Sequence, residues 1–95
     1  MKWLRELRSS GLNRRAFWCV ERGDFQEAAS LLERAIQLNP HRADSHQELS
    51  ICYDRLGKHE LAEREARAAI SCAPGNPKFS NGLIGVLLRK ASMSK

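Results

Sequence analysis

The sequence predicts an all-α fold made of repeated helix hairpins, and an internal repeat is the main observation behind this prediction. The segment GDFQEAASLLERAIQLNP, from Gly23 to Pro40, recurs as GKHELAEREARAAISCAP, from Gly57 to Pro74. Both ends of the segment shift by 34 positions (57 − 23 and 74 − 40), and a fixed period of this size is typical of stacked repeat architectures. Apolar residues return at helical spacing along the chain, and no segment shows the alternation of a half-buried strand.

The N-terminal residues predict either one helix or two. Trp3, Leu4 and Leu7 have the spacing of one helical face, which indicates a short amphipathic helix over residues 1–8 or an extension of the helix that follows. That next helix is expected from about Leu12 to Arg22, and Ser9-Ser10-Gly11 is the candidate break between them. An exposed amphipathic segment here would also suit a membrane-surface anchor, which eight residues support only weakly.

Turn and capping residues predict where the first hairpin changes direction. Gly23 follows the first helix and can adopt the left-handed conformation that ends helices, because it has no Cβ. Asp24 is then expected as the N-cap, with Glu27 three residues later in a capping-box pattern. The second helix is expected from about Phe25 to Leu38, and Asn39-Pro40 ends it because proline cannot continue the helical ladder.

The second copy repeats this plan and leads into a last helix. A helix from Ala43 to Leu56 ends at Gly57, and the helix after it carries an apolar face of Leu61, Ala62, Ala66, Ala69 and Ile70. Asn76-Pro77 has the pattern of an N-cap and a first-turn proline, so a last helix is expected near residues 78–90, with residues 92–95 frayed. Alanines seven apart share a helical face and allow close helix packing; the pairs are Ala28 with Ala35 and Ala62 with Ala69.

Composition limits the classes of protein that fit. A chain of 95 residues forms one small domain, and the charged N-terminus lacks the apolar core of a secretory signal, so the cytoplasm is the expected location. The three cysteines, Cys19, Cys52 and Cys72, form no CxxC pair and are expected as small buried hydrophobes. Histidines without ligand spacing predict no metal, and no cofactor motif or catalytic constellation is present, so we expect no enzyme.

Charge is unevenly distributed along the chain. Residues 1–22 carry a net charge of +4, residues 23–76 a net charge of −3, and residues 77–95 a net charge of +4. The simplest interpretation is that these residues form solvated helix faces. The alternative is electrostatic attraction between subunits or toward an acidic partner.

On these residues the chain resembles the tetratricopeptide repeat family. The first copy matches that family's pattern at Leu12, Ala16, Gly23-Asp24-Phe25, Ala28, Leu32, Ala35, Leu38 and Pro40. The second copy matches at Leu49, Tyr53, Leu56-Gly57, Ala62, Ala69 and Pro74. The resemblance divides the chain into an N-terminal extension (1–8), repeats at 9–42 and 43–76, and a C-terminal half-repeat with its tail (77–95). Three departures, Arg15, His46 and His59, are expected to weaken packing locally.

The resemblance implies a right-handed superhelix of antiparallel helix hairpins with a concave groove that binds a peptide or a helix of a protein partner. The groove positions of the family fall on Asn13, Arg14, Phe17, Val20, Glu21, Asp44, Gln47, Glu48, Ile51, Asp54, Arg55, Lys78, Asn81, Gly85, Leu88 and Arg89. Members that clamp the carboxylate tail of a chaperone use Lys, Asn, Asn, Lys and Arg, and of the five matching positions only Lys78 agrees. The resemblance therefore disfavours chaperone-tail binding. Because the chain is basic overall, a nucleic-acid or acidic-surface adaptor is the alternative function.

The last helix carries more apolar residues than one neighbouring hairpin can cover. A terminal repeat needs a polar outer face, whereas Leu83, Ile84, Val86, Leu87 and Leu88 crowd this helix. We expect Ile84, Leu87 and Leu88 to take part in self-association as a homo-oligomer or in docking of a partner. A chain cut from a longer array is the competing explanation.

Overall fold

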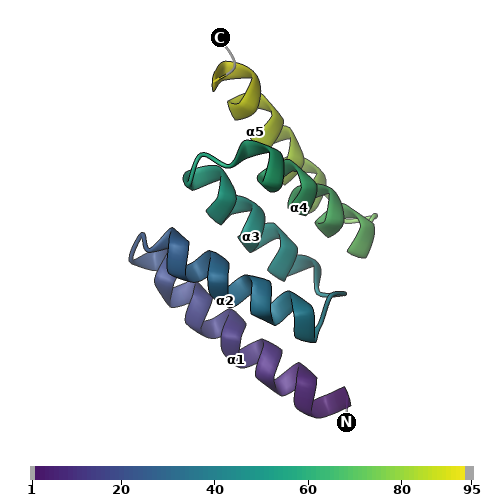
Figure 1. Ribbon diagram of the computed structural model, residues 1–95. Coiled ribbons are helices and arrows are strands. Elements are labelled where there is room, and N and C mark those ends of the chain that lie inside the picture. The colour runs from purple at the N-terminus through teal and green to yellow at the C-terminus, as the bar shows by residue number, and fades with distance from the viewer. Residues whose placement is uncertain (1, 94–95) are drawn as a thin grey trace.

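The computed structural model describes residues 2–93 and consists, over this range, of five helices stacked one after another (Figure 1). The helices are α1 (Lys2–Glu21), α2 (Phe25–Leu38), α3 (Ala43–Arg55), α4 (His59–Cys72) and α5 (Pro77–Met93). Each helix packs mainly on its neighbours in sequence, and α3 also contacts α5. The all-α fold of helix hairpins predicted from the sequence is therefore confirmed.

α1 is one continuous helix, so Ser9-Ser10-Gly11 is not a break and residues 2–8 extend the first hairpin helix. Ser9 is fully buried, and its hydroxyl donates a hydrogen bond to the carbonyl oxygen of Ala35 in α2 at 3.2 Å. The side-chain amide of Asn13 donates to the Ser9 carbonyl at 2.8 Å, one turn later on the same helix. Contact with α2 thus overrides the local signal of the two serines and the glycine. The repeat boundaries themselves stay predictions.

The helix ends follow the expected chemistry. Gly23 and Gly57 adopt φ values of 78° and 80°, where a side chain would be strained. The Asp24 carboxylate accepts a hydrogen bond from the Glu27 amide at 3.4 Å, and the Asn76 side chain accepts one from the Lys78 amide at 3.0 Å. α5 continues to Met93, so the expected fraying at residue 92 is wrong, while residues 94–95 lie outside the described range.

The core lies between the helices of each hairpin and is built around small side chains. Ala28, Ala35, Ala62 and Ala69 are all fully buried, as the seven-residue spacing predicts. Larger residues fill the space beside them, chiefly Leu12, Leu31, Leu32, Leu49 and Tyr53. Because alanine projects only one carbon, helix axes can approach closely at these points.

Each of the two histidine departures has a polar partner. His46 is buried, with Nε2 at 2.8 Å from the Pro40 carbonyl oxygen and Nδ1 at 2.8 Å from the Glu65 carboxylate. His59 Nδ1 lies 2.9 Å from the Asp54 carboxylate, while its Nε2 has no hydrogen-bond partner among the described residues. Arg15 is exposed on α1, where no earlier helix of the described chain covers it. The helices stack through all three positions, and the expected local weakening of packing stays a prediction.

Candidate functional site: the face of α1, α3 and α5

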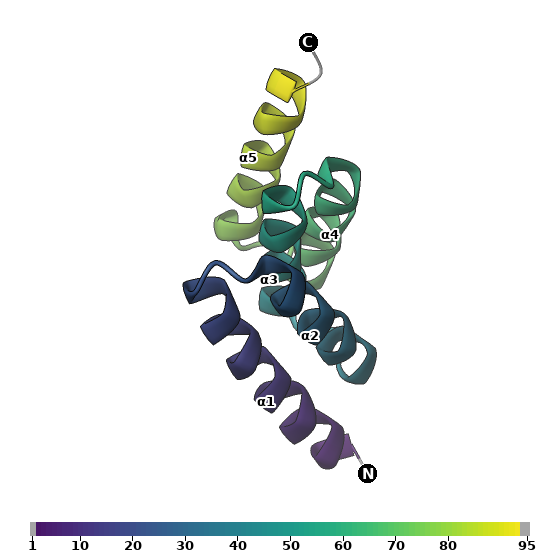
Figure 2. The ribbon, with the colours of Figure 1, turned by 60° about the vertical axis from the view of Figure 1, so that its left-hand side comes forward.

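The alternate helices α1, α3 and α5 line one side of the stack, and α2 and α4 lie on the other (Figure 2). Between α1 and α3 there is a hollow of about 170 Å³. Its lining residues are Asn13, Ala16, Phe17, Val20, Leu32, Arg42, Asp44 and Glu48. The structure therefore brings together five of the predicted groove residues, namely Asn13, Phe17, Val20, Asp44 and Glu48, which come from two helices.

The hollow has an apolar floor and a charged rim. Ala16 and Leu32 are buried at its base, while Phe17 is exposed beside them. Arg42 and Asp44 flank the start of α3 and are exposed. An apolar side chain of a ligand can thus enter the hollow while its charged groups meet the rim.

The carboxylate of Glu48 contributes negative charge to the rim of the hollow. Burial raises the pKa of Glu48 above its ordinary value of 4.5; the cation of Lys78 opposes this rise, and the carboxylates of Asp44 and Glu21 add to it. The repulsion among these three acids means that a cationic side chain placed between them would be favoured. Lys78 already pairs with Asp44 at 2.9 Å from across the α3–α5 contact, and both groups are exposed to water.

Some predicted groove residues serve the α3–α5 contact instead of the hollow. The Asp54 side chain is only 4% exposed, and it accepts hydrogen bonds from Arg89 of α5 and from His59. Gln47 packs against Gly82 so closely that a Cβ there would lie 2.5 Å from its amide nitrogen. A larger residue at position 82 would thus require the Gln47 amide to move. The contacts to Arg89 and His59 leave Asp54 with little free surface.

The other predicted groove residues are scattered over the rest of the face. Arg55 places its guanidinium 5.6 Å from the Phe25 ring centre, at the start of α2. Arg14, Glu21 and Asn81 are exposed and Ile51 is half-buried, and none of them lines the hollow. Arg42 was missed because it precedes α3 in a loop, where no helical periodicity marks it. Its guanidinium lies 3.5 Å from the Ser10 hydroxyl of α1.

The residues predicted for self-association form an apolar surface on α5. Ile84 is 54% exposed and Leu88 is 67% exposed, with Leu87 less exposed between them. Ile84 lies 34 positions after Ser50 (84 − 50), which is buried and donates a hydrogen bond to the Ala62 carbonyl oxygen of α4, the helix that follows α3. By the symmetry of the repeat, this is the face on which a further helix would pack.

The buried Cys52 is a poor candidate for a catalytic nucleophile. Burial raises the pKa of the Cys52 thiol to about 12, so this sulfur stays protonated at neutral pH and is a poor nucleophile. No group of three or more His, Cys, Asp or Glu side chains within residues 2–93 is arranged to hold a metal ion. Over the same range, no helix has both the length and the apolar character needed to cross a membrane.

Comparison with known proteins identifies the repeat. A family model described as tetratricopeptide repeat matches residues 20–83. The chain is also 28% identical over 68 residues to a protein from Pseudomonas aeruginosa named type IV pilus assembly protein PilF. That match covers 72% of this chain and 27% of the relative, so the chain spans about a quarter of the relative's length. With the stacked hairpins and their 34-residue offset, the match over most of the sequence places this chain in the tetratricopeptide repeat family.

Proposed function

We propose that the chain is a non-catalytic protein-interaction module that binds a peptide segment of a partner on the face of α1, α3 and α5. Membership of the tetratricopeptide repeat family supports a protein-binding scaffold in general. The observation that supports this particular face is the hollow between α1 and α3, with Ala16 and Leu32 at its base and Glu48 on its rim. A location in the cytoplasm is part of the same proposal.

The ligand is a segment with one apolar side chain next to a lysine or arginine. The apolar group fills the hollow of about 170 Å³ beside Phe17, which has room for a side chain of leucine size. The cation lies near Glu48, where it relieves the repulsion from Asp44 and Glu21. Phosphate-bearing ligands are disfavoured here because the same carboxylates repel them.

Selection of random peptides displayed on phage tests this proposal. The wild-type chain is expected to enrich peptides that combine an apolar and a basic side chain. A selected peptide is expected to bind Glu48→Gln about 10- to 100-fold more weakly, since a hydrogen bond to a charged group contributes about 1.5 to 3 kcal/mol. Glu60→Gln on the exposed start of α4 is the matched control and should leave the affinity unchanged.

The pH dependence of peptide binding provides a second test of the role of Glu48. Protonation removes the negative charge of Glu48, so affinity for a basic peptide should fall as the solution is acidified. Because burial raises the pKa of Glu48, this loss should begin at a higher pH than for an ordinary glutamate, and it should be absent in Glu48→Gln. The proposal would be overturned if the selected peptides lacked basic residues, or if Glu48→Gln left their affinity unchanged.

The exposed apolar face of α5 supports a second part of the proposal, which is self-association through Ile84, Leu87 and Leu88. The three cations of α5 within the described range each pair with an acid of the same chain, Lys78 with Asp44, Arg89 with Asp54 and Lys90 with Glu63. Charge repulsion between two α5 helices is therefore weaker than the sequence alone indicates. Assembly with other proteins also fits the relative, which is named for type IV pilus assembly.

A further inference from the structure

The two basic ends of the sequence differ in the folded chain. On α5, each of the three described cations pairs with a carboxylate of α3 or α4. α1 carries five basic and two acidic residues, a net charge of +3. Within the described part of the chain, none of those five cations makes an ion pair; they are Lys2, Arg5, Arg8, Arg14 and Arg15. Of the described residues at the two ends, those of α1 therefore present the uncompensated positive charge.

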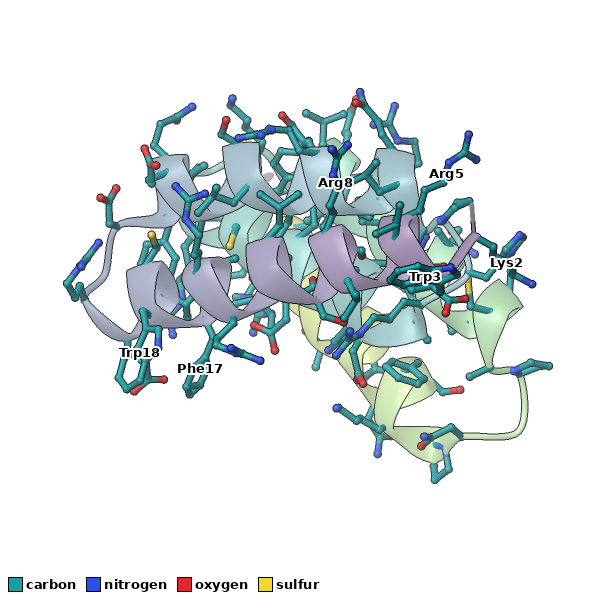
Figure 3. All side chains as sticks on the ribbon, turned by 90° about the horizontal axis from the view of Figure 1, so that it is seen from below. Lys2, Trp3, Arg5, Arg8, Phe17 and Trp18 are labelled. Atoms are coloured by element: carbon teal, nitrogen blue, oxygen red, sulfur yellow. The ribbon has the colours of Figure 1, made fainter. Side chains whose placement is uncertain are left out.

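The same helix carries large apolar side chains on its outward side. Trp3 is 59% exposed, Leu7 is 62% exposed and Trp18 is 60% exposed, with Leu4 exposed beside them. Residues 3, 7 and 18 are four and eleven positions apart, which places them on one face of a helix, opposite the buried Leu12 and Ala16. Figure 3 shows Trp18 and Phe17 projecting from the side of α1 away from α2, with Trp3 toward the other end of the helix. We call this surface, made of Trp3, Leu4, Leu7 and Trp18, the outer face of α1.

The repeat register argues against another helix stacking on the outer face. Arg15 and Trp18 lie 34 positions before Leu49 and Cys52 (49 − 15 and 52 − 18), both of which are buried inside the stack. A helix packed here in the same way would have to bury a guanidinium and a whole indole. Tryptophan and arginine together are instead characteristic of the water–lipid boundary, where the indole is partly buried and the cation stays hydrated.

A basic hollow borders the outer face on the side of α2. It has a volume of about 490 Å³ and is lined by Arg8, Gly11, Leu12, Arg15, Arg34, Gln37 and Leu38, with no acidic residue among them. Arg8 and Arg5 project on this side of α1 (Figure 3). Guanidinium groups bind phosphate with two parallel hydrogen bonds, and the hollow has room for a phosphate headgroup.

We propose that α1 lies flat on an anionic lipid bilayer through this outer face. Trp3, Leu4, Leu7 and Trp18 enter the boundary between headgroups and acyl chains, and Arg8 and Arg15 contact lipid phosphates. Charge complementarity selects an anionic surface over a zwitterionic one, because each arginine close to such a surface contributes about 1 kcal/mol. The helix lies on the membrane and does not span it. The inference does not depend on the peptide-binding hollow between α1 and α3.

Binding to lipid vesicles tests the inference directly with the full chain. The chain is expected to sediment with vesicles of phosphatidylglycerol and phosphatidylcholine and to stay in solution with phosphatidylcholine alone. Trp3 and Trp18 are the two tryptophans of the chain, so their emission should shift to shorter wavelength on the anionic vesicles. Removing two positive charges with Arg8→Gln and Arg15→Gln should weaken partitioning about 30-fold, since these charges contribute about 2 kcal/mol together.

A charge-matched variant distinguishes binding through the outer face of α1 from general attraction of a basic chain to anionic lipid. Lys58→Gln with Arg64→Gln removes the same charge from exposed positions at and near the start of α4, and should weaken partitioning much less. Leu4→Ser with Leu7→Ser keeps every charge and should still reduce binding and the emission shift. Equal losses in the two charge variants, equal binding to zwitterionic vesicles, or binding to single-stranded RNA without any vesicle binding would each overturn the inference. Circular dichroism checks that all variants keep their helix content.

Discussion

At the scale of single residues, four alanines determine how closely the helices of this stack approach. Ala28 and Ala35 serve the first hairpin and Ala62 and Ala69 the second, and each of the four is completely buried. Interiors are packed as densely as organic crystals, so a larger side chain has no free volume to enter. The repeat therefore depends on small side chains at these four positions as much as on its leucines.

Ala28→Leu is expected to destabilise the chain by about 1–3 kcal/mol, because the added carbons must push α1 and α2 apart. Urea unfolding followed by circular dichroism measures the change. Ala91→Leu adds the same atoms on an exposed part of α5 and should change stability by no more than about 0.5 kcal/mol. Equal behaviour of the two variants would show that the hairpins are not closely packed at Ala28.

At the scale of elements, a buried acid links α5 to α3, while α5 packs mainly on α4. Asp54 of α3 receives hydrogen bonds from Arg89 of α5 and from His59 of α4, and its side chain is almost inaccessible to water. Lys78 and Asp44 join the same two helices α5 and α3, but both groups are exposed. The two contacts should therefore differ in strength.

Asp54→Ala is expected to cost about 1–3 kcal/mol, because Arg89 and His59 lose a buried acceptor. Asp44→Ala removes an exposed ion pair and should cost no more than about 1 kcal/mol. Thermal unfolding of both variants measures the difference. The contact at Asp54 would be unimportant if both changes lowered stability to the same extent.

The sequence predicted the helices better than the surfaces between them. Periodicity and capping residues located all five helices, because these are local signals that the structure keeps. The sequence left open whether Ser9-Ser10-Gly11 interrupts the first helix, because the contact that buries Ser9 is with Ala35, 26 positions away. Asp54 was expected in the groove for a similar reason, as its partner Arg89 lies 35 positions away. Pairings over such distances cannot be read from spacing within one helix.

At the scale of the whole molecule, the stack is elongated, with principal extents of 48 × 30 × 17 Å, and it has two unlike ends. The two ends are equal in net charge, because residues 1–22 and residues 77–95 each carry a net charge of +4. The fold separates them: α5 has paired cations and exposed leucines, while α1 has unpaired arginines and exposed tryptophans. Different partners are therefore expected at the two ends.

Self-association through α5 is tested by sedimentation velocity at tens of micromolar. The wild-type chain is expected to sediment as an oligomer, and Ile84→Glu with Leu88→Glu as a monomer, because two buried carboxylates would oppose the apolar contact. Leu4→Glu with Leu7→Glu makes the same change at the opposite end and should leave the oligomer intact. A monomeric wild-type chain would rule out this part of the proposal.

The central position of α3 affects the order in which the helices unfold. It packs against α2, α4 and α5, whereas the first two turns of α1 have every side chain exposed from Lys2 to Arg8. Repeat stacks lose structure from the periphery, since each unit is supported only by its neighbours. Brief opening events thus begin at the termini, and the central helix keeps its amide hydrogens longest. A protease that needs an unwound substrate would trim this chain inward from both sides before it cut the middle.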